Sequence, residues 1–211
     1  SLGVIALIGL LTSVLLNGLS AFVQTKLTIP IALSQEQVDE AEQALLKTGA
    51  YRQIMVTNLA EVLAERGIEA PAADVVELLS GEAPATLRNW VLAHPDRVGE
   101  TVEFSFLTNS RIDGYFKGRV TMASAEIDSQ VSPEQLQLAD ALKEAGLIDT
   151  AFNWGFLTMP DASENRAEAA GLGVALLGSL YMMIVVLVLA LPIGVAASIY
   201  LEEVAPKNWV T

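Results

Sequence analysis

The feature that most constrains this chain is an uncharged apolar stretch of thirty residues, Gly171 to Tyr200, which contains no Asp, Glu, Lys, Arg or His. About 20 predominantly apolar residues are enough for a helix to cross roughly 30 Å of hydrocarbon. The stretch is therefore long enough to span a membrane with some tilt. The sequence predicts a transmembrane helix within residues 169–201.

Several residues inside this stretch indicate packing against other helices. Pro192 removes a backbone donor, which transmembrane helices tolerate where neighbouring groups satisfy the freed carbonyl. Ala190, Gly194 and Ser198 are spaced four apart and form a stripe of small side chains that another helix can approach closely. We therefore expect a helix that belongs to a bundle, with Pro192 and this stripe as helix-packing candidates.

A second apolar run, Leu2 to Val23, predicts a first transmembrane helix within residues 1–25. A cleaved signal peptide is disfavoured, because such a peptide has a basic flank and a shorter apolar core. Gly9, Ser13 and Asn17 share one helical face and are further packing candidates, with Asn17 as a hydrogen-bonding partner for a neighbouring helix. Because the chain begins inside the apolar run, we expect a cytoplasmic segment to precede it in the natural protein.

Charge is confined to the region between the two apolar runs. Residues 26–168 carry 11 basic and 23 acidic residues, which gives −12 of the total net charge of −13. This distribution predicts a water-soluble insert between two spans, followed by a short tail, 202–211. An acidic, cysteine-free insert of this kind favours an extracytoplasmic, periplasmic location, although long translocated domains largely escape the positive-inside rule.

The insert has the periodicity of a helix-rich domain with a small β component. Gly67, Gly81 and Gly146 are expected to end helices, and Ser34 and Ser132 to cap them. The predicted helices are 34–49, 51–66, 71–81, 84–93 and 132–144; the predicted strands are 101–107 and 115–122, joined by a turn at 109–114; and 152–160 is an aromatic connector of the kind found near membrane interfaces.

The residues do not assemble a recognisable enzyme site. The acidic balance disfavours nucleic acid, the absence of cysteine excludes thiolate chemistry, and no phosphate-binding Gly-rich loop is present. His94 is interpreted as a helix-end residue, the carboxylates near Glu40 as a solvated face, and 109–114 as a turn rather than a calcium loop. We expect no catalytic residue, no cofactor and no metal.

Four basic residues surround the predicted strands and leave two interpretations open. They can be solvated surface charge, partly neutralised by nearby carboxylates, or they can attract an anion or a partner. They are Arg97, Arg111, Lys117 and Arg119.

The second apolar run and its continuation carry a family resemblance. Gly178, Ser179 and Tyr181, then Pro192 to Ala197, then Ile199 to Asn208 match the G-S-x-Y…P-I-G-V-A-A-x-I-Y-L-E-E-x-A-P-K-N stretch of PstA-type permeases, the membrane subunits of bacterial phosphate ABC importers. Some of these permeases have a large extracytoplasmic insert that ends in F-N-W-x-F, which Phe152–Phe156 resembles.

The resemblance implies the start of a type I ABC importer permease fold: a mainly α membrane protein whose two first spans flank the helix-rich insert. It implies a bacterial inner-membrane location and a multi-pass full-length protein, of which this chain is an N-terminal fragment unable to transport alone. The implied partners are a second homologous permease, ATPase subunits and a periplasmic phosphate-binding protein. Glu202 and Glu203 are then partner-facing candidates on the cytoplasmic side, with a solvated helix end as the alternative.

Two other functions fit the span–domain–span layout. A transmembrane sensor or chemoreceptor has the same layout, but its second span should continue as a signalling helix, whereas Pro206 interrupts this one. A membrane-anchored periplasmic binding or scaffold module is the third possibility. Under the permease interpretation, the insert either docks the binding protein or steadies the periplasmic face of the complex.

Overall fold

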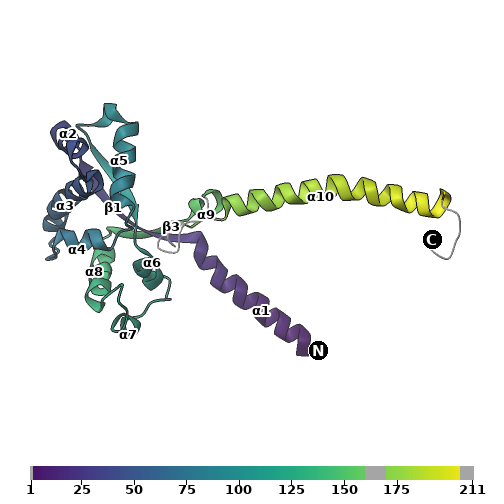
Figure 1. Cartoon of the computed structure of the whole chain (residues 1–211). Helices are drawn as coiled ribbons and strands as arrows, with labels where there is room; N and C mark the ends of the chain where they lie inside the picture. The colour runs from purple at the N-terminus through teal and green to yellow at the C-terminus, as the bar shows by residue number, and fades with distance from the viewer. Residues whose placement is uncertain (1, 160–169, 205–211) are drawn as a thin grey trace.

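The computed structural model describes residues 2–159 and 170–204 and consists of a folded head from which two long helices extend (Figure 1). The N-terminal helix α1, Leu2–Leu19, and the C-terminal helix α10, Gly173–Ile199, leave the same side of the head and then diverge. The chain is helix-rich with one small sheet, as the sequence predicts. Membrane association is consistent with α10, which is long and apolar enough to span a bilayer.

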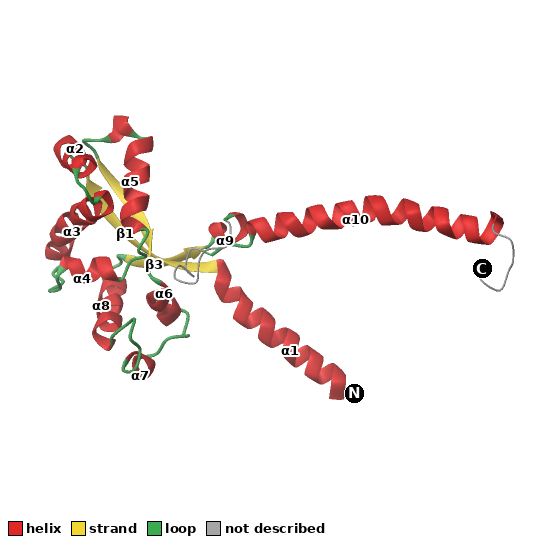
Figure 2. Cartoon of the chain, viewed as in Figure 1, coloured by secondary structure: helices red, strands yellow, loops and turns green. Residues whose placement is uncertain are grey.

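The head is built around a three-stranded antiparallel sheet in the order β2-β1-β3 (Figure 2). The central strand β1, Val23–Ala32, pairs with β2, Thr101–Leu107, along most of its length. Its N-terminal half, Val23–Leu27, also pairs with β3, Ile148–Phe152, in a register that sets Val23 opposite Phe152. Because β1 follows α1 and β3 precedes α10, this pair brings the two exits from the head together.

One face of the sheet forms the core and the other is polar. Alternate residues of β1, such as Leu27 and Ile29, are buried, and Ile29 lies opposite the buried Phe104 of β2. On the other face, Thr28 Oγ1 and Ser105 Oγ lie 2.8 Å apart and share a hydrogen bond. This period-two alternation is the pattern of a strand with one face buried.

Helices cover the buried face. The long helix α3, Lys47–Arg66, packs on β1 and contributes fully buried Tyr51, Met55 and Leu59. The remaining helices and helical turns are η1 (Ser20–Phe22), α2 (Gln35–Gln43), α4 (Ala72–Glu77), α5 (Ala83–Ala93), η2 (Pro95–Arg97), α6 (Ser110–Phe116), α7 (Met122–Ala125), α8 (Pro133–Glu144), α9 (Trp154–Thr158) and a π-helical turn at Tyr200–Val204.

Several predicted boundaries are confirmed. α3 ends at Gly67, whose φ of 68° is the left-handed conformation that favours glycine at a helix C-terminus. α8 begins at a capping box in which the Ser132 and Gln135 side chains each accept from the other residue's backbone N–H. Strand β2 has the predicted bounds.

Other expectations are wrong. The helix expected over Leu2–Val23 ends at Leu19, because the alternating residues from Val23 onward join the sheet as β1. The strand expected at 115–122 does not form: Asn109 accepts from the backbone N–H groups of Arg111 and Ile112 and so starts α6 in place of a turn. Gly49 lies inside α3 rather than ending a helix, and α2 stops at Gln43.

Strands β1 and β3 are absent from the sequence-based expectation. Pro30 argues against a central strand, but it lies beyond the end of β3 and opposite Glu103 of β2. The N–H groups of Thr28 and Ala32, two residues before and after it, donate to Leu147 and Asn58 and not to β2, so the nitrogen of Pro30 faces the side on which no strand pairs with it. The polar segment 161–168, expected to connect the head to the second span, lies outside the described residues. Residues 205–211 of the expected tail also lie outside them.

Candidate functional site

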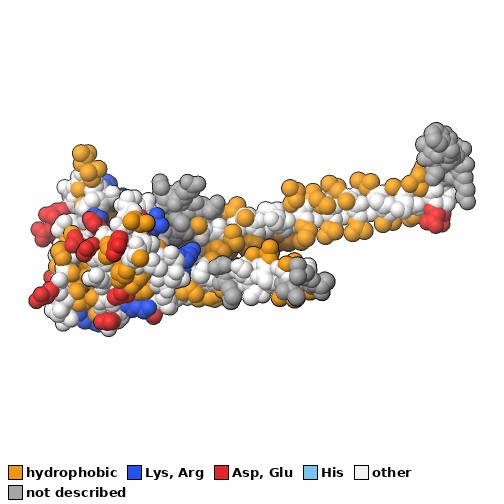
Figure 3. All heavy atoms as spheres, turned by 90° about the horizontal axis from the view of Figure 1, so that it is seen from below, with side chains coloured by type: hydrophobic (Ala, Val, Ile, Leu, Met, Phe, Trp, Pro, Cys, Tyr) orange, Lys and Arg blue, Asp and Glu red, His pale blue; other side chains and the backbone are white. Residues whose placement is uncertain are grey.

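Apolar side chains are exposed along the whole length of helix α10, and Figure 3 shows one face of this surface. Among the described residues, the helical segment Gly173–Glu203 is the one long and apolar enough to cross a membrane, and none of its membrane-length window is buried in the protein. A helix that is apolar on every side requires lipid or other apolar helices around it. This surface is therefore the largest candidate interaction site of the chain.

The predicted packing residues of α10 lie on an open surface. The helix continues through Pro192, and an ideal Cβ built on Gly194 would meet no atom within 4 Å. Beside Pro192 lies a shallow apolar hollow of about 450 Å³ lined also by Leu191 and Ile199. Ala190 and Ser198 are exposed as well, so nothing in the described chain occupies the face that they form.

Glu202 and Glu203 lie in the π-helical turn that ends α10, at the end of the helix far from the head. The 27 residues of α10 span roughly 40 Å at 1.5 Å per residue, which exceeds the thickness of a hydrocarbon core. Both carboxylates are exposed. A membrane crossed by α10 therefore separates them from the head.

The packing candidates of α1 are placed in part. Gly9 and Ser13 are exposed on the helix, and a Cβ on Gly9 would meet open space. The side chain of Asn17 lies outside the described residues. α1 contains 18 residues, which corresponds to roughly 27 Å.

An aromatic cluster surrounds the point where both helices leave the head. The Phe22 ring stacks on Phe152 at 6.1 Å and meets Phe156 edge-on at 5.2 Å, while Phe152 meets Trp154 at 4.8 Å. Trp154 is 70% exposed although it belongs to this cluster. Exposed aromatic residues next to an apolar helix are typical of the membrane–water interface. We call Phe22, Phe152, Trp154 and Phe156 the aromatic collar.

Asn153 links the two exits at the centre of the collar. Its side chain is buried, with Nδ2 donating to the Ala21 carbonyl at 3.2 Å and Oδ1 accepting from the Phe156 N–H at 2.9 Å. Its own N–H donates to the Phe22 carbonyl at 2.8 Å. One side chain thus binds the end of the α1 segment and caps α9, which precedes α10.

Two glycines allow α9 and the start of α10 to touch through their backbones. A Cβ on Gly173 would lie 2.6 Å from the Thr158 carbonyl oxygen, and one on Gly171 would lie 2.8 Å from that of Gly155. The Leu172 N–H donates to the Phe156 carbonyl at 2.7 Å. We call this contact the glycine joint; it attaches α10 to the head without any intervening side chain.

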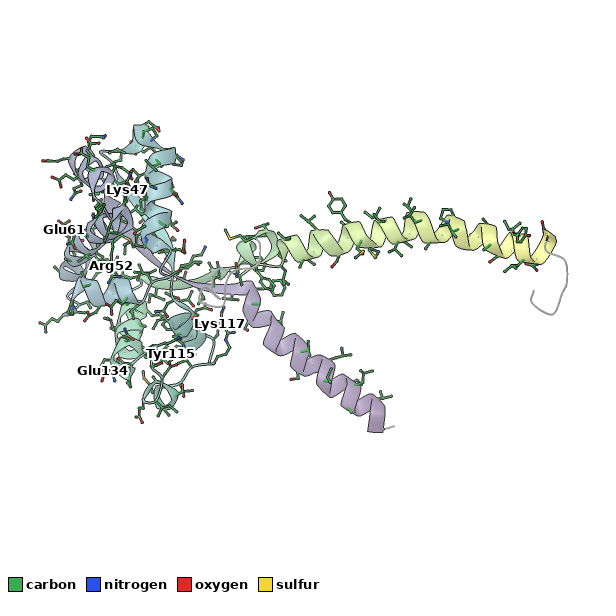
Figure 4. All side chains as sticks on the ribbon, viewed as in Figure 1. Lys47, Arg52, Glu61, Tyr115, Lys117 and Glu134 are labelled. Carbon is green, nitrogen blue, oxygen red and sulfur yellow. The ribbon has the colours of Figure 1, made fainter. Side chains whose placement is uncertain are left out.

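Three of the four basic candidates line one pocket beside the collar. The pocket has a volume of about 480 Å³ and is lined by Ala21, Ser110, Arg111, Asp113, Gly114, Lys117, Arg119, Val120, Gln130, Asn153, Phe156 and Ala170. The fourth, Arg97, lies elsewhere: it pairs with Glu100 at 3.0 Å and lies 5.6 Å from the Trp90 ring centroid. Lys117 projects near the base of α1 (Figure 4).

We call this pocket the basic pocket. Asp113 forms ion pairs with two of its basic side chains, Lys117 and Arg119. Its Oδ2 lies 2.6 Å from Lys117 Nζ and 3.6 Å from Arg119 Nη2, and its Oδ1 accepts from the Thr25 N–H at 3.0 Å. The Asp113 and Lys117 side chains are 8% and 11% exposed. Arg111 Nε is bound by Gln130 Oε1 at 3.0 Å and Asp128 Oδ2 at 3.3 Å. The sequence interpretation includes Asp113 among the carboxylates that neutralise the basic residues, and the structure pairs it with Lys117 and Arg119. Its burial and its bond to the Thr25 N–H are not predicted, because the sequence interpretation assigns the segment to a turn.

The remaining titratable candidates have structural roles. His94 follows α5, stacks on Trp90 and shares a hydrogen bond of 2.9 Å with the Trp90 carbonyl. In the carboxylate cluster of α2, Glu42 pairs with Arg88 at 2.7 Å, which lowers the pKa of the Glu42 carboxyl to about 2. Burial raises the pKa of neighbouring Tyr51 to about 12. The ion pair of Glu42 and Arg88 joins α2 to α5.

Within the described residues, no group of three or more His, Cys, Asp or Glu side chains could hold a metal ion. The geometry of the chain therefore concentrates its candidate sites in two places, the open surface of α10 and the collar region at its base.

No curated protein and no solved structure matches this chain. A family match covers residues 1–126, more than half of the chain, and includes α1, two strands of the sheet and the helices up to α7. The matched region thus includes both the N-terminal apolar helix and the part of the head that follows it up to α7. The chain belongs to the family described as a domain of unknown function, DUF3333.

Proposed function

We propose that this chain is the N-terminal part of a permease subunit of an ATP-driven phosphate importer in the bacterial inner membrane. The observation that carries the proposal is α10: its apolar surface is open on every side, and it holds the G-S-x-Y and P-I-G-V-A-A residues that resemble PstA-type permeases. Such a helix fits a multi-helix transporter better than a single anchor, because a lone anchor gains nothing from Pro192 or from a small-residue stripe.

In this proposal α1 is the first span, α10 the second, and the head is periplasmic. Both helices leave the same side of the head, as two consecutive antiparallel spans require. Roughly 27 Å of α1 is sufficient for a hydrocarbon core at the thin end of the usual range. Glu202 and Glu203 then lie at the cytoplasmic side, where ATPase subunits bind permeases.

The partners supply the chemistry that this chain lacks. ATP is hydrolysed on the ATPase subunits, a second permease completes the pathway, and a periplasmic binding protein delivers phosphate. The stripe of Ala190, Gly194 and Ser198 packs against a helix of this assembly, either later in the same polypeptide or in the second permease.

A matched pair of substitutions in the full-length gene tests the packing surface. Ala190→Leu places a large side chain on the stripe, whereas Ala175→Leu makes the same chemical change at an exposed position of the same helix that lies outside the stripe and outside the hollow beside Pro192. We expect Ala190→Leu to reduce co-purification of the second permease and the ATPase and to reduce phosphate uptake, and Ala175→Leu to change both much less. Uptake that survives deletion of the gene, or purification without any ATPase, contradicts the proposal.

A sensor is the second candidate, favoured by the span–head–span layout. Its signal would have to pass through α10, but this helix contains Pro192 and ends in a π-helical turn at Tyr200–Val204. Both features interrupt a rigid helix. Pro192 and the π-helical turn therefore favour the permease over the sensor.

The head either docks the binding protein or steadies the complex, and a structure-guided deletion separates these roles. Replacing residues 28–147 with Asn-Gly leaves Val23–Leu27 paired with β3 through a two-residue hairpin turn. Lower affinity for the binding protein in the full-length complex supports docking. Unchanged affinity with a less stable complex supports the steadying role.

A further inference from the structure

The basic pocket lies beside the ends of α1 and α10 at which both helices join the head. Ala21 is two residues beyond the end of α1, Phe156 belongs to α9, and Ala170 is three residues before α10, and all three line the pocket. If α10 crosses a bilayer, the pocket lies beside the first turn of the span and next to the aromatic collar. A lipid headgroup in that bilayer can therefore reach the pocket.

The pocket concentrates positive charge in an otherwise acidic protein. The chain carries a net charge of −13, yet Arg111, Lys117 and Arg119 line this single pocket. Among the described residues, the carboxylates that face them are Asp113 in the lining and Asp128 beside Arg111, so three positive charges meet two negative ones. Acidic side chains on the distant parts of the head are screened at the pocket, because the Debye length is only about 8 Å at physiological ionic strength. The local field is therefore positive.

The basic side chains retain donors for a ligand. Arg119 is 61% exposed, and its 3.6 Å separation from Asp113 Oδ2 is too long for a hydrogen bond. Arg111 is 40% exposed, and its Gln130 and Asp128 contacts within the described part of the chain both involve Nε, whereas a guanidinium has five donor hydrogens. Lys117 is held rigidly by Asp113, so its charge is preorganised.

We propose that the basic pocket binds the phosphate group of an anionic membrane lipid, with Arg111 and Arg119 as its direct ligands and Lys117 as a fixed positive charge. Guanidinium groups bind phosphate through paired hydrogen bonds. The volume of about 480 Å³ accommodates a glycerophosphate headgroup. The location beside α1 and α10 favours a lipid over a free anion, because a bilayer supplies headgroups at this level permanently. The site does not depend on the transport proposal.

Native mass spectrometry of the full chain in non-ionic detergent tests this site. The delipidated protein is titrated with phosphatidylglycerol, with zwitterionic phosphatidylcholine and with inorganic phosphate. We expect phosphatidylglycerol to bind in preference to phosphatidylcholine and millimolar phosphate not to displace it. The double variant Arg111→Gln with Arg119→Gln should lose roughly tenfold in phosphatidylglycerol affinity, because two interfacial cations are removed.

A matched double variant controls for net charge. Arg52→Gln with Arg97→Gln removes two cations of similar exposure that pair with Glu77 and Glu100 away from the pocket, and it should leave the lipid preference unchanged. Arg111→Lys with Arg119→Lys should restore part of the preference, and thermal melts establish that the variants are folded. Equal losses in both double variants, or no loss in the pocket variant, overturn the proposal. Displacement of the lipid by inorganic phosphate identifies a soluble anion as the ligand and overturns the lipid assignment.

Discussion

Asn153 donates a hydrogen bond from Nδ2 to the carbonyl oxygen of Ala21, across 3.2 Å of space and 132 positions of sequence. The same side chain accepts from the Phe156 N–H and so caps α9. The exits of α1 and α10 are therefore coupled through one buried amide, surrounded by the aromatic collar.

Substitution of Asn153 should weaken this coupling in two separable steps. Asn153→Asp keeps an acceptor for the Phe156 N–H but loses the donor to Ala21, whereas Asn153→Ala loses both. We expect Asn153→Ala to lower the free energy of unfolding by about 2 kcal/mol, since a lost cap costs about 1 kcal/mol and an unpaired buried carbonyl a similar amount. Urea denaturation in mild detergent, followed by circular dichroism, measures both variants. An Asn153→Ala chain that is as stable as the unmodified chain contradicts this account.

The glycine joint predicts strong sensitivity at Gly173. A Cβ there would lie 2.6 Å from the Thr158 carbonyl oxygen, so Gly173→Ala must push α10 away from α9. We expect the Leu172 amide, which donates to the Phe156 carbonyl, to exchange with solvent much faster in this variant.

Gly178→Ala provides the matched control, because it makes the same change on the same helix where a Cβ meets no atom within 4 Å. In Gly178→Ala, the Leu172 amide should be as protected as in the unmodified chain when hydrogen exchange is followed by mass spectrometry. Equal exchange in both alanine variants would mean that the joint does not hold α10.

The pair of Glu42 and Arg88 predicts a pH dependence of stability. The hydrogen bond from Arg88 lowers the pKa of the Glu42 carboxyl in the folded chain from 4.5 to about 2. The unfolded chain binds the proton first on acidification, so the stabilisation is complete above about pH 5 and is lost as the pH falls from about 4.5 to about 2. The pair is partly exposed, so we expect Glu42→Gln to cost on the order of 1 kcal/mol at pH 7.

The measurement is a series of urea midpoints between pH 7 and the acid limit of folding. Glu42→Gln should flatten the decline in the acidic range, whereas Glu40→Gln, which alters an exposed carboxylate on the same helix, should run parallel to the unmodified chain. Parallel curves for all three proteins would exclude Glu42 as a source of acid sensitivity.

Asp113 and Lys117 should behave as a coupled pair. Asp113→Asn leaves the Lys117 ammonium unpaired although that side chain is only 11% exposed, which we expect to cost about 3 kcal/mol. Adding Lys117→Met should recover part of this loss, because the buried charge is then removed. A double-mutant cycle in urea measures the coupling, with Arg119→Gln as a control on the exposed member of the group. Additive effects of the two substitutions would show that the pair is not coupled.

Much of the head could be predicted from local signals. Helix α3 ends at Gly67 because only a residue without a Cβ easily adopts the left-handed backbone conformation found there. The spacing of Ser132 and Gln135 predicts the start of α8. The alternation in Thr101–Leu107 predicts β2. These features depend on neighbours within four residues.

The parts that could not be predicted depend on distant partners. β1 follows an apolar helix and contains Pro30, and its identity as the central strand follows from pairing with residues 69 or more positions away. Tyr115 and Phe116 resemble strand residues but lie in α6, because Asn109 caps that helix and Asp113 anchors it to the Thr25 N–H. The basic pocket likewise combines residues from α6, η1 and α9, a proximity that no spacing in the sequence reveals.

The pairing of Val23 with Phe152 makes the head a detachable module. Neighbouring antiparallel strands lie about 5 Å apart, so α1 and α10 leave the head from adjacent positions, whatever length of chain is folded between β1 and β3. A domain with this geometry can be gained, lost or enlarged between the two helices during evolution while the helices keep their relative positions.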